Sequence, residues 1–245
     1  MTVTITAAPS TVTGAAYLEI TTTNPVVALT RTDKNGTRPV RLEAGALPFT
    51  GTATFRDYEP ALSGPVLYRA STDYGTAETS TTLAGQGPRF TVPASPLLSV
   101  GAATVYDYAA NRKTRSTVHE VIGRADPIIV RARMGTRTGT LSIVCADHAD
   151  LMDLEAVFAL GATVMFRQAE HAGLDMYFHA TETAAVPNTG KWELTVSYVE
   201  LTYPAGPVLG AWTFADLAAT GATFAEIAAA YPSFTALLLN TPGPL

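Results

Sequence analysis

Two carboxylates in the first half of the chain, Asp57 and Glu59, have the spacing of a catalytic pair. Residues two apart on a β-strand point to the same face. Two carboxylates on one face could serve as acid and base in glycoside hydrolysis. Two solvated side chains on an ordinary strand give the same pattern, so the pair alone does not predict an enzyme.

The histidines and the single cysteine offer two further candidate sites. His171 and His179 flank Asp175, and a hairpin between them would bring the two imidazoles together, as metal binding requires. Surface or loop positions explain the same residues more simply. Cys145 lies in the apolar run 143–146 and is expected to be a small buried side chain rather than a nucleophile. We therefore predict no metal site, and a lone cysteine excludes an intrachain disulfide.

Short signatures of common enzyme classes are absent from the sequence. It contains no Gly-x-Ser-x-Gly, no His-Glu-x-x-His, no phosphate-binding loop and no Gly-x-Gly-x-x-Gly. We expect no catalytic residue and no cofactor, and we expect that the chain is not an enzyme. A sugar-binding platform of aromatic side chains is conceivable, although their spacing is more typical of core positions; the candidates are Phe55, Tyr58, Tyr68, Tyr106 and Tyr108.

The densest charged feature is basic. Seven of the sixteen Lys and Arg residues lie within 112–137, where only Glu120 and Asp126 oppose them. Arginine is favoured at protein interfaces, and the alternative is a solvated face. Arg131 and Arg133 are expected to share one face of a strand. The predicted interface arginines are Arg112, Arg115, Arg131, Arg133 and Arg137.

Composition supports a protein that is covered by partners. The 245 residues are 47% hydrophobic, which is enough for a core, but only 15% charged, against about 25% in a typical protein. The net charge of −5 argues against a dedicated nucleic-acid binder. The first ten residues lack a basic residue and a long apolar run, so we expect no secretory signal. No apolar stretch approaches the roughly 18–20 residues of a membrane span.

The first part of the chain predicts a β-sandwich. Short β-like runs recur roughly every 8–12 residues, without helical periodicity, which is typical of immunoglobulin-like and fibronectin-III-like domains. Residues 34–36, Lys-Asn-Gly, predict a hairpin with a tight type I′ turn. We place the sandwich at 12–94 after an N-terminal extension, 1–11. The prolines at 93 and 96 predict a boundary, followed by a linker over 95–111.

The second part predicts another β domain, over residues 112–206, that contains one helix. Leu151, Leu154 and Val157 lie at helical spacing and predict a helix over 148–160. Asp147 is expected to cap its N-terminus, and Gly161 its C-terminus. Strands are expected at 118–122, 127–134, 139–145, 163–167, 175–181 and 191–201.

The final segment, 207–245, predicts short helices. Two near copies, 212–217 and 222–227, each carry a capping-box pattern. Helices this short are marginal in isolation, so they must pack on something. Docking on the second domain of the same chain and docking on a neighbouring subunit both remain open. The large side chains available for that contact are Trp212, Phe214, Leu217, Phe224, Ile227, Tyr231 and Phe234.

Several phrases, in this order, resemble minor tail proteins of long-tailed phages that infect actinobacteria. They are residues 56–60 (Arg-Asp-Tyr-Glu-Pro), 66–70, 124–130, 137–141 and 211–217, joined by the helix that ends at Gly161 and the strand 192–200. The second domain is also similar to the ring-forming domain of distal tail proteins, a split β-barrel that carries a helix. The likeness extends over nearly the whole chain from Tyr17.

The resemblance implies a non-catalytic structural component of the virion. It would assemble as a homo-oligomeric ring, a hexamer, that connects the tail tube to the host-recognition apparatus at the tail tip. Its partners would be the tail tube protein, other tail-tip proteins and the tape measure protein. DNA would pass through the lumen without being bound specifically, and no membrane insertion is expected. The alternative function is a carbohydrate-binding module that attaches to a cell surface.

Overall fold

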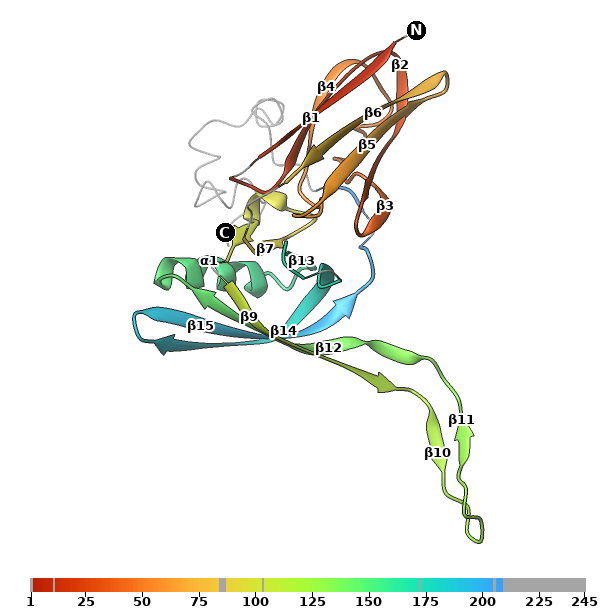
Figure 1. Cartoon of the computed structure of the whole chain (residues 1–245), viewed down its shortest axis with the longest axis vertical. Helices are drawn as coiled ribbons and strands as arrows, with labels where there is room; N and C mark the ends of the chain where they lie inside the picture. The colour runs from red at the N-terminus through yellow and green to blue at the C-terminus, as the bar shows by residue number, and fades with distance from the viewer. Residues whose placement is uncertain are drawn as a thin grey trace, which may run out of the picture.

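The computed structural model describes residues 2–208, apart from residues 11, 84–86, 103, 172 and 205. The predicted helices of the C-terminal segment lie outside the described residues, and so do the large side chains expected to anchor them: Trp212, Phe214, Leu217, Phe224, Ile227, Tyr231 and Phe234. The described part is mainly β with one α-helix, as the sequence predicts (Figure 1). Its buried hydrophobic side chains form two separate clusters, one for each of two sheets.

The first sheet folds over on itself because one long strand belongs to both of its layers. The N-terminal half of that strand pairs with β1 and β4, and its C-terminal half pairs with β3 and β5. The register shifts between Thr22 and Val26, on either side of Asn24-Pro25. The strands are β1 (Val3–Pro9), β2 (Ala16–Asp33), β3 (Gly36–Pro39), β4 (Phe49–Asp57), β5 (Pro65–Thr72) and β6 (Gly75–Thr82).

Two sequence predictions for this region need correction. Residues 3–9 are not an extension, because they pair along β2 and bury Ile5 in the core. The hairpin at residues 34–36 is present, but its turn residues are Lys34 and Asn35, and Gly36 has the positive φ of +98°. A type I′ turn needs positive φ at both central residues, so this is a different turn, in which the glycine with positive φ follows the two central residues. Asp33 favours it by accepting a hydrogen bond from the Asn35 N–H at 2.8 Å.

The second sheet is curled into a half-barrel, and α1 (His148–Ala159) packs on one face (Figure 1). All its pairings are antiparallel, in the order β8-β7-β13-β14-β15-β12-β9. A short 3-10 turn, η1 (Pro96–Leu98), connects the first two strands. The strands are β7 (Arg89–Thr91), β8 (Val100–Gly101), β9 (Thr104–Thr114), β12 (Met134–Cys145), β13 (Val164–Arg167), β14 (Met176–Asn188) and β15 (Lys191–Leu201).

The expected boundary at the prolines is therefore misplaced. Residues 89–91, assigned to the sandwich, pair with β13 of the second sheet. The supposed linker 95–111 contains β8 and most of β9, which pairs with β12. The prolines separate two strands of the same sheet, because extended proline-rich backbone also suits a connection within a sheet.

The helix prediction is confirmed in detail. Asp147 accepts a hydrogen bond from the Asp150 N–H at 2.9 Å, and Gly161 has a φ of +62° after the last turn. Leu151, Leu154 and Val157 lie in the core of the second sheet. The helix thus covers one face of the sheet through an apolar stripe.

The ends of β9 and β12 continue into a two-stranded ribbon that projects from the molecule (Figure 1). Its outer strands are β10 (Thr117–His119) and β11 (Ile128–Val130), which pair only with each other. We call residues 113–136 the arm. Arg131 and Arg133 lie between β11 and β12 rather than in a strand, so the prediction that they share a strand face is wrong.

Candidate functional site: an interdomain seam and a projecting arm

The predicted carboxylate pair lies in a buried network at the junction of the two sheets. Asp57, at the end of β4, accepts hydrogen bonds from Arg31 at 2.7 and 2.8 Å and from the Tyr68 hydroxyl at 3.0 Å. Arg31 also forms an ion pair with Asp33, with 3.2 Å between Nε and Oδ2. The Arg31 and Asp57 side chains are each 1% exposed, so neither can meet a substrate without unfolding this region.

The protonation of this network follows from its burial and its charges. Burial opposes the charge on Arg31, but Asp57 and Asp33 outweigh it and raise the pKa of Arg31 above its ordinary value. Burial raises the pKa of the Tyr68 hydroxyl, and Asp57 raises it further. Arg31 stays cationic and Tyr68 stays a hydrogen-bond donor through the physiological range. The centre is a paired structural network rather than an acid–base pair, and Arg31 Nε is held in it only by the ion pair with Asp33.

Glu59 connects the two sheets directly. One carboxylate oxygen accepts a hydrogen bond from Arg41 at 2.5 Å, and the other accepts one from the Tyr177 hydroxyl on β14 at 2.8 Å. Arg41 also donates to the backbone oxygens of Pro204 and Gly206 beyond β15. Burial and the Glu59 charge raise the pKa of Tyr177, which keeps its proton. The first domain is therefore linked to the second at two points, through Tyr177 and through Arg41.

A third buried arginine, Arg167, joins the two sheets without pairing with a carboxylate. It is fully buried and donates from Nη1 to the backbone oxygens of Gly14 at 2.9 Å and Pro60 at 2.8 Å, and from Nη2 to the Thr91 hydroxyl at 3.1 Å. Burial lowers the pKa of Arg167 to about 10, so it is still protonated at neutral pH. One side chain of the second sheet thus orders two loops of the first.

The β2–β3 hairpin closes the edge of the junction on Asp175. Lys34 Nζ lies 3.3 Å from Asp175 Oδ2, and the Asn35 amide donates to the same oxygen at 2.8 Å. The other oxygen accepts the Gln168 N–H at 3.1 Å. These contacts use the carboxylate that a metal site with His171 and His179 would need. Within the described residues no group of three or more His, Cys, Asp or Glu side chains is arranged to hold a metal ion.

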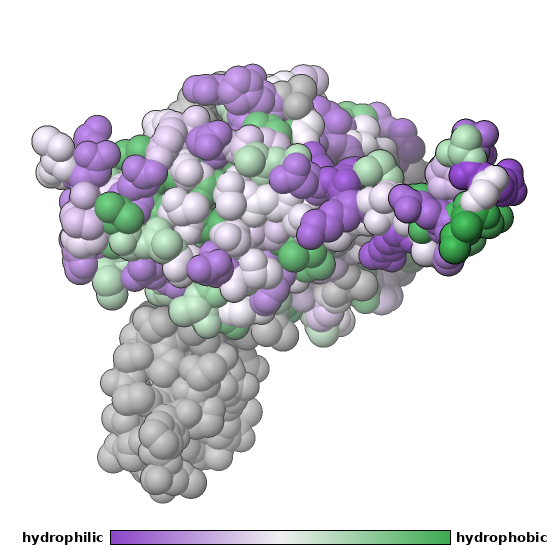
Figure 2. Space-filling model, turned by 90° about the horizontal axis from the view of Figure 1, so that it is seen from below, coloured by the Kyte–Doolittle hydropathy of each residue, from purple (hydrophilic) through white to green (hydrophobic). Residues whose placement is uncertain are grey.

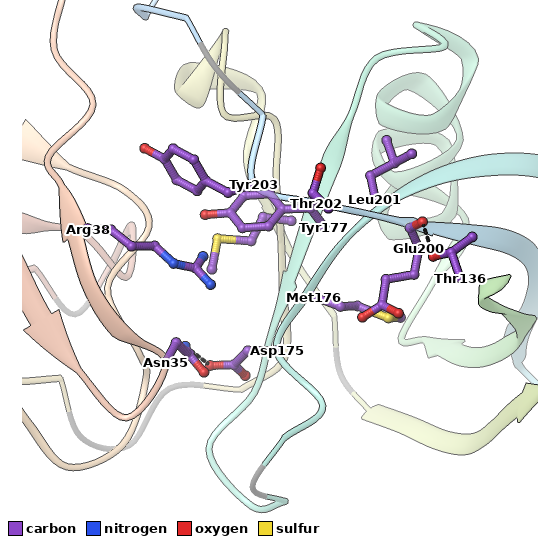
Figure 3. A pocket seen from close by; sticks show the side chains of 11 residues that line it. Asn35, Arg38, Thr136, Asp175, Met176, Tyr177, Glu200, Leu201, Thr202 and Tyr203 are labelled. Atoms are coloured by element: carbon purple, nitrogen blue, oxygen red, sulfur yellow. Dashed lines mark hydrogen bonds between the residues drawn. The ribbon is translucent and has the colours of Figure 1, made fainter. Parts of the chain in front are cut away.

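These contacts together form what we call the seam: Arg31, Asp33, Lys34, Asn35, Arg41, Asp57, Glu59, Tyr68, Arg167, Asp175 and Tyr177. A cavity of about 390 Å³ opens beside it, between β3 and the ends of β14 and β15 (Figure 3). Arg38 reaches into it toward Tyr177 and Tyr203, with its guanidinium carbon 5.5 and 5.3 Å from the two ring centres. The guanidinium group covers ring surface that a stacked sugar would otherwise use.

The arm has the opposite character to the seam. Every residue from 113 to 136 is exposed except Ser116 and Gly135. Figure 2 shows the arm at the right of the view, with hydrophobic residues gathered beside hydrophilic ones. The exposed large hydrophobic residues of the arm are Val118, Val121, Ile122, Ile128, Ile129, Val130 and Met134.

The base of the arm is fixed by Glu200 on β15. Its carboxylate accepts hydrogen bonds from Arg137 Nε at 2.8 Å and from Arg137 Nη2. The hydrogen bonds from Arg137 lower the pKa of Glu200. Arg112 lies 3.9 Å from the same carboxylate. Two of the five predicted interface arginines therefore have a partner within the chain, whereas Arg115, Arg131 and Arg133 are exposed on the arm.

The remaining candidate side chains are dispersed. Tyr68 is buried in the seam, Phe55 packs edge-on to Phe49, and Tyr108 stacks on Tyr198 in the second domain, so the proposed aromatic platform does not form as one surface. Cys145 is buried, and burial raises the pKa of its thiol, as expected for a core residue. Sequence reasoning missed the roles of Arg31, Arg41, Arg167 and Glu200, whose partners are distant in the chain.

The chain matches no protein-family model, and no curated protein matches it significantly. No helix in the described part of the chain is both long and apolar enough to cross a membrane.

Proposed function

We propose that this chain is a structural subunit of a phage tail tip, which assembles with copies of itself into a hexameric ring. The observation that carries the proposal is the arm, because a two-stranded ribbon is marginal in water and this one exposes apolar side chains along its length. Exposed apolar surface of this kind marks an interaction site. The sequence phrases that resemble minor tail proteins supply the biological setting.

The seam supports a mechanical role. A ring subunit must hold an accessory domain in a fixed orientation, and buried charge pairs give directional contacts that a smooth apolar interface lacks. Asp57 and Glu59 are each paired with an arginine and a tyrosine hydroxyl, which favours support over catalysis. The ring would connect the tail tube to the host-recognition apparatus, with other tail-tip proteins and the tape measure protein as neighbours.

Carbohydrate binding at a cell surface is the second candidate. The cavity beside the seam is the observation in its favour, because Asn35, Asp175 and two tyrosines line it. Its aromatic rings already contact Arg38, which favours the structural role. A glycan array probed with the full chain separates the two candidates, since only a lectin should give saturable, sugar-specific signal.

Mass photometry of the purified full chain, followed by negative-stain electron microscopy, tests the proposal. We expect a closed ring of one defined mass at micromolar concentration. Gold-labelled antibody against the chain should bind the tail tip of particles that encode it. A chain that stays monomeric, or label on the capsid alone, would contradict the proposed function.

A further inference from the structure

The charges of the chain are divided between the arm and the rest of the molecule. The arm holds five of the sixteen Lys and Arg residues and only two of the twenty-one carboxylates. The rest of the chain therefore has eleven cations against nineteen carboxylates and is strongly acidic. A basic arm on an acidic body is complementary to a second copy of the same chain.

The most one-sided acidic surface of the second domain surrounds α1. Residues 138–166 contain four carboxylates, Asp147, Asp150, Asp153 and Glu155, and no Lys or Arg. Two large hydrophobic residues are also exposed here: Met152 on the helix, at 50%, and Leu160 at its C-terminal cap, at 47%. The outer face of α1 thus combines acidic and apolar groups, as the arm combines basic and apolar groups.

An arm cannot reach the helix of its own chain. The arm includes the first three residues of β12, and α1 starts just after β12 ends. Because a strand rises about 3.3 Å per residue, the rest of β12 holds the end of the arm and the start of α1 roughly 30 Å apart. The arm also projects away from the side of the domain that carries α1 (Figure 1). Any contact between them is therefore made between two molecules.

The ribbon exposes apolar side chains on both of its faces. Val118 and Ile129 are paired on one face, whereas Ile128 and Val130 lie on the other with His119 and Thr117. A lipid bilayer is a poor partner, because the unpaired backbone edges and the arginines of the arm would lose their hydration there. A protein surface satisfies both the apolar and the charged groups.

We propose that the arm of one copy docks on the outer face of α1 of the next copy. This inference rests on the proposed ring and names the contact that builds it. The two surfaces lie on different parts of the molecule, so the contact is head-to-tail, and repeated head-to-tail contacts close into a ring. In this contact the exposed apolar side chains of the arm supply most of the buried area, and Arg131 and Arg133 face the carboxylates of the helix.

Charge reversal in the full chain tests the docking. The arm variant is Arg131→Glu with Arg133→Glu, and the helix variant is Asp153→Lys with Glu155→Lys; these positions leave the helix cap at Asp147 intact. Each variant alone should assemble at least about tenfold more weakly than wild type, because like charges then face each other. Mixing the two should restore assembly, because every arm then finds a helix of opposite charge in an alternating ring. A chain with both reversals should assemble by itself.

The controls separate this inference from the proposed function. Glu19→Lys with Glu43→Lys changes two charges on the first domain and should assemble like wild type, and circular dichroism should show every variant folded. A wild-type chain that never assembles defeats the proposed function. The docking alone is overturned if the arm variant and the helix variant each assemble as well as wild type when tested separately, or if mixing the two does not restore assembly. The docking is also overturned if assembly is lost only when residues 209–245 are deleted. It is likewise overturned if the arm binds anionic vesicles while the chain does not assemble, because a membrane rather than a second copy would then cover the arm.

Discussion

The seam and the arm place opposite kinds of residue in unexpected environments. The seam buries arginines and carboxylates, and every carboxylate in it has a cation or a hydroxyl partner. The arm exposes isoleucine, valine and methionine with no partner in the described chain. Buried charge is tolerated where each group is satisfied, whereas exposed apolar surface is tolerated where another molecule covers it. The seam completes the fold of the chain, and in the proposed assembly the arm contacts a neighbouring copy.

The largest effect on stability should come from removing one partner of the seam. Asp57→Ala leaves Arg31 and the Tyr68 hydroxyl without their shared acceptor in a buried site. Loss of one partner of a buried pair costs about 3–5 kcal/mol. Urea unfolding should therefore show a much lower midpoint.

The matched control for this change is Arg69→Ala, which removes an exposed pair with Glu78 on the same domain. Exposed pairs contribute about 0–1 kcal/mol. Equal losses in the two variants would mean that the seam is no more important than a surface ion pair.

A somewhat smaller loss should follow from crowding the sheet near the base of the arm. A Cβ added at Gly139 on β12 would lie 1.8 Å from the backbone oxygen of Ala109 on β9, so Gly139→Ala must force the strands apart. Overpacking of this kind costs about 1–3 kcal/mol. Gly101→Ala on β8, where the nearest contact is a side-chain atom at 3.9 Å, should change the thermal midpoint little. Equal thermal midpoints for Gly139→Ala and Gly101→Ala would show that the close approach of β9 to Gly139 does not limit which side chain the site accepts.

The thermal stability of the chain should depend on pH through the Arg137–Glu200 pair at the base of the arm. Arg137 lowers the pKa of Glu200 in the folded state, so this carboxylate stabilises the fold above its unfolded pKa, near about 4.3, and the contribution disappears as pH falls through the folded pKa. Glu200→Gln should therefore lower the thermal midpoint at pH 7. The difference from wild type should shrink as the pH falls below the unfolded pKa and vanish below the lowered folded pKa. A difference that stays constant from pH 7 into strong acid would mean that Glu200 acts through packing alone.

The smallest effect on the stability of the folded chain should come from a substitution on the exposed strand β11 of the arm. Ile129→Thr on β11 changes an exposed side chain, and surface substitutions usually alter stability by less than about 0.5 kcal/mol. Measured on dilute monomer, its unfolding midpoint should match wild type, whereas assembly should weaken. A clear loss of monomer stability would show that Ile129 packs against its own chain.

Local sequence patterns predicted the parts of the fold that local forces determine. The helix cap at Asp147, the glycine at 161 and the alternation along the last strand each depend on neighbours within a few residues. The seam could not be predicted, because Arg31 and Asp57 are 26 positions apart, and Tyr177 is 118 positions from Glu59. The run Ile128-Ile129-Val130 falls within the strand expected over 127–134, and the structure leaves all three of these apolar side chains exposed. Such a violation of the usual rule is expected where function replaces folding as the constraint.

Hydrogen–deuterium exchange on the full chain, compared between dilute monomer and assembled protein, tests the central claim most directly. Amides of residues 113–136 should exchange at least about tenfold more slowly in the assembly, because a neighbouring copy covers the arm. Amides of the seam should be protected equally in both states. An assembled protein whose arm exchanges as fast as that of the monomer would contradict the account.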